Sequence, residues 1–172
     1  MKTLISVLTF FIVTSSQGAI GPNPDDIHVT DAQKTKNYLN EGLVIGGDRT
    51  IDDVIVLDIR YATNSDFERI VIDLDGNKNG EPAVIQRPPY YQVEVSKEYN
   101  RAVVTVYGKP KLAFDAKRVK KSFRKSRAIK SVDLFPLIEK NRWTFSLNLK
   151  PGKYIEVFEL SNPVRVILDI KK

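Results

Sequence analysis

The sequence has no cysteine, a single histidine, a single methionine and a single tryptophan among its 172 residues. Without cysteine, the chain has neither a disulfide framework nor a thiolate metal site, and it offers no cysteine for lipid attachment. The one histidine, His28, lies in a polar segment, so neither a serine triad nor a histidine-based zinc site can be assembled. We therefore expect no metal, no cofactor and no catalytic activity, and a stability that comes from an ordinary apolar core.

Long hydrophobic runs are also scarce, and the clearest one stands at the N-terminus. Lys2 provides a positive start, Leu4–Val13 is apolar, and Gly18 and Ala19 are the small residues typical of a cleavage site. The run has about half the length that a membrane-spanning helix needs. Residues 1–19 are therefore predicted to be a secretory signal peptide, and no later segment is predicted to span a membrane. We expect a periplasmic protein.

The net charge of +6 favours anionic partners. Because the protein is expected outside the cytoplasm, nucleic acid is a poor candidate. Peptidoglycan, another anionic envelope polymer or lipid headgroups fit better, and an outer-membrane or cell-wall protein complex is a further candidate partner.

Two regions differ in their patterning. Residues 20–53 are polar and contain the breakers Gly21-Pro22 and Gly46-Gly47, which predicts an N-terminal arm or linker, with one helical turn around Lys34 to Leu39. Residues 54–172 instead alternate with period two, which is typical of strands. Eight strands are predicted, over residues 54–60, 69–75, 90–96, 101–107, 129–135, 143–149, 154–160 and 164–170.

The strands form two similar sets. Arg69-Ile-Val-Ile-Asp-Leu corresponds to Arg142-Trp-Thr-Phe-Ser-Leu, and Tyr91-Gln-Val-Glu-Val to Tyr154-Ile-Glu-Val-Phe. We interpret residues 54–107 and 129–171 as copies of one four-stranded unit. The predicted fold is all-β, with two packed four-stranded sheets related by internal duplication. Between the copies, apolar residues at helical spacing predict one short amphipathic helix, with Asp115 as its N-cap.

The strands beginning at Arg69 and Arg165 repeat one spacing, an arginine followed four residues later by an aspartate. Alternation places Arg69 and Asp73 on the solvent face of the first strand, and Arg165 and Asp169 on that of the last. A single such pair is commonly a weak surface ion pair. Because the spacing occurs twice, we predict that these outer faces bind a ligand such as a glycopeptide, whose amides and carboxylates suit a guanidinium beside a carboxylate.

These motifs resemble the AMIN domain, which bacteria attach to cell-wall amidases and outer-membrane secretins. The resemblance covers residues 54–172 and includes the arginine-led strand, the Tyr-x-Val-x-Val strand and the ending Asn162-Pro163-Val-Arg165. It implies two packed sheets and targeting to peptidoglycan, with Arg69, Asp73, Arg165 and Asp169 as the outer-face residues. AMIN domains usually precede a catalytic or pore domain, whereas this sequence ends after the motif, so we expect a free-standing adaptor.

A second candidate is the basic segment that contains the predicted helix. It carries no acid and is either a solvated face or a surface for anionic lipid or polymer. Its cations are Lys117, Arg118, Lys120, Lys121, Arg124, Lys125, Arg127 and Lys130.

Two further patterns are weaker. Asp75-Gly-Asn-Lys-Asn-Gly80 has the ligand spacing with which a calcium loop begins, but Gln86 stands where the closing glutamate belongs, and a hairpin turn explains the same residues. Asp73, Asp75 or Asp169 are the candidate acids for glycoside cleavage, although nothing in the sequence places two of them across a cleft.

The leading hypothesis is a non-catalytic peptidoglycan-binding module of the cell envelope. The alternative is a protein-interaction adaptor that docks onto an envelope machine such as a secretin, by strand addition or through its arm.

Overall fold

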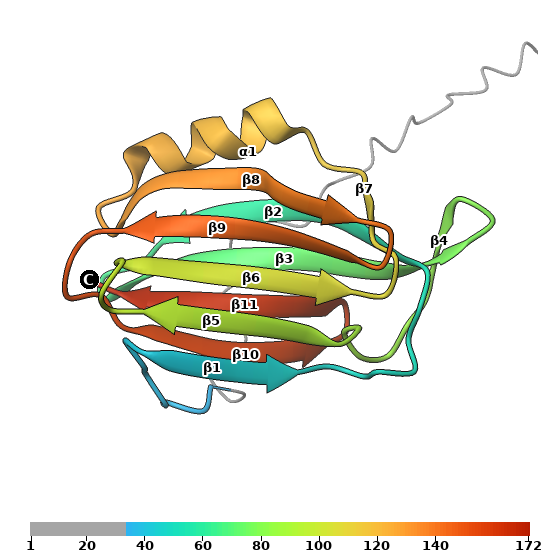
Figure 1. Cartoon of the computed structure of the whole chain (residues 1–172), viewed down its shortest axis with the longest axis horizontal. Coiled ribbons are helices and arrows are strands. Elements are labelled where there is room, and N and C mark those ends of the chain that lie inside the picture. The colour runs from blue at the N-terminus through green and yellow to red at the C-terminus, as the bar shows by residue number, and fades with distance from the viewer. Residues whose placement is uncertain (1–33) are drawn as a thin grey trace, which may run out of the picture.

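The computed structural model describes residues 34–172, so the predicted signal peptide and the first part of the predicted arm lie outside the described residues. Two β-sheets pack face to face (Figure 1). One is five-stranded, in the order β1-β5-β6-β9-β8; the other is six-stranded, in the order β10-β11-β3-β2-β7, with β4 paired to β3. The predicted all-β, two-sheet architecture with one short helix is confirmed.

The elements are β1 (Gly42–Gly46), β2 (Val54–Thr63), β3 (Phe67–Lys78), β4 (Glu81–Ala83), β5 (Tyr91–Ser96), β6 (Arg101–Tyr107), β7 (Lys111–Leu112), α1 (Ala116–Ser122), the 3₁₀ turn η2 (Phe123–Lys125), β8 (Ile129–Glu139), β9 (Arg142–Leu149), β10 (Ile155–Ser161) and β11 (Val164–Lys171).

The eight predicted strands correspond to β2, β3, β5, β6, β8, β9, β10 and β11. The predicted arm is different: β1 lies within it and pairs antiparallel with β5, so this part of the arm belongs to the sandwich. No helical turn forms at Lys34 to Leu39; this stretch is irregular up to Leu39, which makes a β-bridge to Ile155. Pairing with β10 takes the place of a local turn.

The strand order supports a duplication but distributes the copies differently from the prediction. In the five-stranded sheet, β5 and β6 of the first copy are followed by β9 and β8 of the second. In the six-stranded sheet, β10 and β11 of the second copy are followed by β3 and β2 of the first. Each copy therefore contributes one strand pair to each sheet instead of forming a sheet of its own. The stretch from Gly76 to Pro89 carries the first copy from one sheet to the other.

The core lies between the two sheets. Trp143 is fully buried there, and its Nε1–H donates to the carbonyl oxygen of Leu134 at 2.7 Å. On one side, α1 lies along β8 (Figure 1) and buries Val119 and Phe123. The predicted cap is confirmed, because the Asp115 side chain accepts from two backbone N–H groups at the start of α1. Within residues 34–172, no helix is long and apolar enough to cross a membrane.

Candidate ligand pocket on the six-stranded sheet

The two arginine–aspartate motifs meet across the central strand pair of the six-stranded sheet. Strands β3 and β11 run antiparallel, in a register that places Asp169 opposite Arg69 and Arg165 opposite Asp73. Arg69 donates to both carboxylate oxygens of Asp169, at 2.6 and 2.7 Å. Arg165 donates through Nε to Asp73, at 2.9 Å. The four predicted residues therefore form two ion-pair centres at opposite ends of one sheet face.

The prediction that these four residues face solvent is wrong. Arg69 is 1 % exposed, Asp169 0 % and Arg165 7 %, while Asp73 is half-buried. The physical reason is that this face of the sheet has a core of its own. A second apolar cluster lies between the ion pairs and consists of Val71, Phe158, Leu160 and Ile167. Strands that are buried on both faces lack an exposed polar face, and β11 is buried at seven consecutive residues, 164–170.

The Arg69–Asp169 centre is sealed, and we call it the closed end of the sheet. Lys34 adds a second cation, with its Nζ 3.0 Å from Asp169 Oδ2. Glu156 of β10 stands opposite Asp169 and accepts from the backbone N–H of Lys36 at 2.6 Å. Burial and the neighbouring carboxylate of Glu156 raise the pKa of Tyr38 to about 12. Because Arg69 and Asp169 are paired with each other and almost fully buried, they offer no surface to a ligand, and removal of either partner would leave an uncompensated buried charge.

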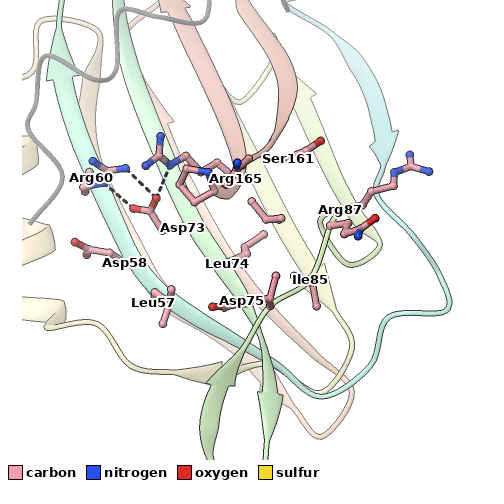
Figure 2. A pocket seen from close by; sticks show the side chains of 15 residues that line it. Leu57, Asp58, Arg60, Asp73, Leu74, Asp75, Ile85, Arg87, Ser161 and Arg165 are labelled. Atoms are coloured by element: carbon pink, nitrogen blue, oxygen red, sulfur yellow. Dashed lines mark hydrogen bonds and ion pairs between the residues drawn. The ribbon is translucent and has the colours of Figure 1, made fainter.

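The Arg165–Asp73 centre borders a pocket, and we call it the open end. Arg60 of β2 joins it and donates to both oxygens of Asp73, at 2.6 and 2.8 Å (Figure 2). The adjoining pocket has a volume of about 1040 Å³. Its lining residues are Leu57, Asp58, Arg60, Asp73, Leu74, Asp75, Val84, Ile85, Gln86, Arg87, Ser161, Asn162, Pro163, Val164 and Arg165.

Four parts of the chain build this pocket, and residues 73–75 of β3 are one of them. The turn between β10 and β11 contributes Ser161 to Val164, and the segment after β4 contributes Val84 to Arg87. A β-bulge in β2, between Val56 and Asp58, leaves Leu57 outside the regular ladder, and Leu57 is 36 % exposed. Bulges commonly redirect a side chain in this way. Val84 is 93 % exposed, so the pocket keeps apolar surface in contact with water.

The chemistry of the pocket is mixed. Its lining has three arginines and three aspartates around aliphatic side chains, and the described residues that line it include no aromatic, histidine or cysteine. Guanidinium groups bind carboxylates, and carboxylates bind amines and amides. Such a lining suits a ligand that carries carboxylates as well as amines or amides, joined by aliphatic segments.

The calcium-like sequence forms a hairpin instead of a loop. β3 continues to Lys78, which pairs with Glu81 across a turn at Asn79 and Gly80. Both turn residues have positive φ, +57° and +99°, as tight hairpin turns require. Within residues 34–172, no three His, Cys, Asp or Glu side chains gather where they could hold a metal ion. Asp75 instead lines the pocket.

Of the three candidate acids for glycoside cleavage, two lie in the same pocket and the third does not. Asp73 and Asp75 line the pocket, whereas Asp169 lies at the closed end, paired with Arg69. Asp73 is held between two arginines.

The predicted basic residues are all on the surface. Lys117, Arg118, Lys120 and Lys121 lie on α1, Arg124 and Lys125 on η2, Arg127 in the following loop and Lys130 on β8. Arg118 forms an ion pair with Asp58, which also lines the pocket.

Sequence reasoning missed Arg60, Arg87 and Leu57. Arg60 ends the predicted strand 54–60, and only the pairing of β2 with β3 shows that it reaches Asp73. Leu57 becomes accessible through a bulge, which alternation cannot reveal. Arg87 lies in a proline-rich stretch without a periodic signal.

Comparison with protein-family models, with curated proteins and with solved structures gives no match to this chain. The AMIN resemblance remains a prediction from short motifs, and the function must be argued from the pocket.

Proposed function

We propose that this protein is a non-catalytic binding module of the cell envelope, of AMIN type, and that it binds peptidoglycan through the pocket at the open end. The observation that carries this proposal is the cluster of Arg60, Asp73 and Arg165 beside a large, partly apolar pocket. Clefts of this kind, with a few convergent polar groups, are the usual sites for small ligands.

The pocket favours the stem peptide of peptidoglycan over its glycan strand. A stem peptide offers carboxylates, amides and an amine on a short aliphatic chain. Within residues 34–172, Arg87 and Asp75 of the lining are in no ion pair and can meet these groups directly, and Leu57, Val84 and Ile85 supply apolar contact. A glycan strand offers mainly hydroxyl groups, which make weaker, uncharged hydrogen bonds.

The proposal is tested by sedimentation of the purified protein with isolated sacculi. Arg87→Ala combined with Val84→Ser changes two exposed pocket residues and leaves the buried ion pairs intact. We expect at least tenfold weaker binding, since one charge-assisted hydrogen bond and one apolar contact are lost. Arg101→Ala, on an exposed arginine of the other sheet, is the matched control and should bind like the wild type.

A second arm uses sacculi from which an amidase has removed the stem peptides. Binding should disappear from these naked glycan strands. Equal retention of the wild type and the double variant would reject the pocket, and equal binding to the naked strands would reject the stem peptide as the ligand.

One observation favours the alternative function, a protein-interaction adaptor. β1 is the outermost strand of the five-stranded sheet, and its Leu43 and Ile45 are each 53 % exposed. An exposed edge strand with apolar side chains is suited to strand addition by a partner protein. In-cell cross-linking from position 43 should then give one dominant protein adduct that Ile45→Lys abolishes, while sacculus binding persists.

A further inference from the structure

The basic residues around α1 form a surface that the pocket does not use. We call it the basic ridge, and it consists of Lys117, Arg118, Lys120, Lys121, Arg124, Lys125, Arg127 and Lys130, all exposed. The fold gathers them on one side because the apolar face of the helix is turned inward. Val119 and Phe123 are buried against the core, so the intervening cations point away from it.

Little negative charge offsets the ridge. Within residues 34–172, Arg118 is the one ridge residue in an ion pair, with Asp58. Asp115 is occupied as the helix cap. Glu68 lies buried beneath the ridge and accepts the backbone N–H groups of Arg127 and Ala128. The exposed Asp133 of β8 lies between Lys130 and Phe135 in the sequence, and the eight cations of the ridge leave the surface with a net positive charge.

Exposed apolar side chains lie on β8, and one of them, Phe135, lies beside a cation of the ridge. On β8, which runs alongside α1 (Figure 1), Phe135 is 45 % and Ile138 59 % exposed, with exposed Pro136 between them. The Phe135 ring stacks on Phe114, with 6.4 Å between centroids, and lies 6.0 Å from Lys120 Nζ. A ridge that served only solubility would not need this apolar edge.

We propose that the basic ridge and the apolar edge of β8 together bind the surface of an anionic phospholipid bilayer. Cations attract anionic headgroups, and adjacent aromatic and aliphatic side chains enter the interfacial layer. Charge complementarity alone would equally suit a soluble polyanion. The Phe135–Ile138 edge favours the bilayer, since a fully hydrated polyanion gives these side chains no apolar medium to enter.

The test is co-sedimentation of the protein with vesicles of phosphatidylcholine mixed with phosphatidylglycerol, and with vesicles of phosphatidylcholine alone. We expect binding to the anionic vesicles only, and its loss at high salt. The variant Lys121→Gln, Arg124→Gln, Lys125→Gln should bind about 100-fold more weakly, since each cation contributes about fivefold. The control Lys78→Gln, Lys97→Gln, Arg101→Gln removes the same charge from exposed positions elsewhere and should keep most of the binding.

Phe135→Ser tests the apolar edge separately and should weaken vesicle binding about tenfold without a change in charge. Circular dichroism establishes that each variant is folded. The proposal is overturned if anionic vesicles fail to sediment the wild type, if both triple variants lose binding equally, or if Phe135→Ser binds like the wild type. Binding to soluble polyphosphate but not to vesicles would also overturn it, in favour of a polyanion. No outcome of this assay depends on sacculi, so it is independent of the proposed pocket function.

Discussion

The two ends of the six-stranded sheet carry the same arginine–aspartate pair in two different environments. At the closed end, Arg69 and Asp169 are almost completely inaccessible and are joined by Lys34. At the open end, Arg165 and Arg60 share the carboxylate of Asp73, and all three residues border a pocket. The spacing within the two strands is the same, so the motif alone does not decide its role. Access to solvent decides whether the pair is structural or available to a ligand.

The comparison predicts that the two pairs contribute differently to the free energy of unfolding. A buried charge whose partner is removed stays in a medium that solvates it poorly, whereas water in a pocket can replace a lost partner. The following substitutions test this difference, in order of decreasing expected effect.

The largest effect is expected at the closed end. Arg69→Met keeps the aliphatic volume but leaves the buried Asp169 with Lys34 as its charged partner, and it should lower the free energy of unfolding by about 3 to 5 kcal/mol. Urea unfolding followed by circular dichroism measures this. Adding Asp169→Leu removes the stranded charge and should recover most of the loss. If the single variant is as stable as the wild type, the closed end is not the structural centre that we describe.

Glu68, whose side chain points from β3 to the core side, should make folding sensitive to acid. Burial acts to raise the pKa of the Glu68 carboxyl, but hydrogen bonds from the Ser126 hydroxyl and from the backbone N–H groups of Arg127 and Ala128 lower it overall. A lowered pKa stabilises the fold above the ordinary value of 4.5, and this contribution is lost as the pH falls through the folded-state pKa.

Glu68→Gln removes the titrating group and should cost about 2 kcal/mol at neutral pH, because charge-assisted hydrogen bonds are lost. The variant should also show a flatter dependence of unfolding free energy on pH below the ordinary pKa. Urea unfolding at a series of pH values measures both effects. If the unfolding free energies of the variant and the wild type depend on pH in the same way, Glu68 is not the group that makes folding sensitive to acid.

At the open end, Asp73→Asn should cost only about 1 to 2 kcal/mol, because the asparagine oxygen can still accept a hydrogen bond from Arg165 and pocket water can solvate Arg60. The measurement is the same urea titration. A decrease in the free energy of unfolding as large as that of Arg69→Met would show that the two ends contribute equally to stability.

The smallest effect on stability is expected for Arg87→Ala, on the exposed wall of the pocket. Its thermal unfolding midpoint should match that of the wild type, because surface side chains away from buried networks contribute little to stability. Its binding to sacculi should nevertheless weaken. A destabilised Arg87→Ala variant with unchanged binding would contradict the proposal that the open end binds the ligand.

The regular elements were largely predictable from the sequence. The eight long strands have clear alternation, and Asp115 begins the helix as its spacing predicts. β1 was missed because its glycine-rich, polar surroundings resemble a linker, and pairing with β5 is what makes it a strand. The calcium-like segment was ambiguous because turn residues and calcium ligands are the same residue types.

The sequence by itself determined that this chain folds as a two-sheet β-protein, and it identified the four arginine and aspartate residues that form the ion-pair centres. Only the tertiary structure decided which arginine meets which aspartate, that one pair is sealed, and that Arg60, Arg87 and the Leu57 bulge complete a pocket beside the other. The physical reason is that alternation assigns a side chain to a face of its strand. What covers that face depends on contacts between residues far apart in the chain.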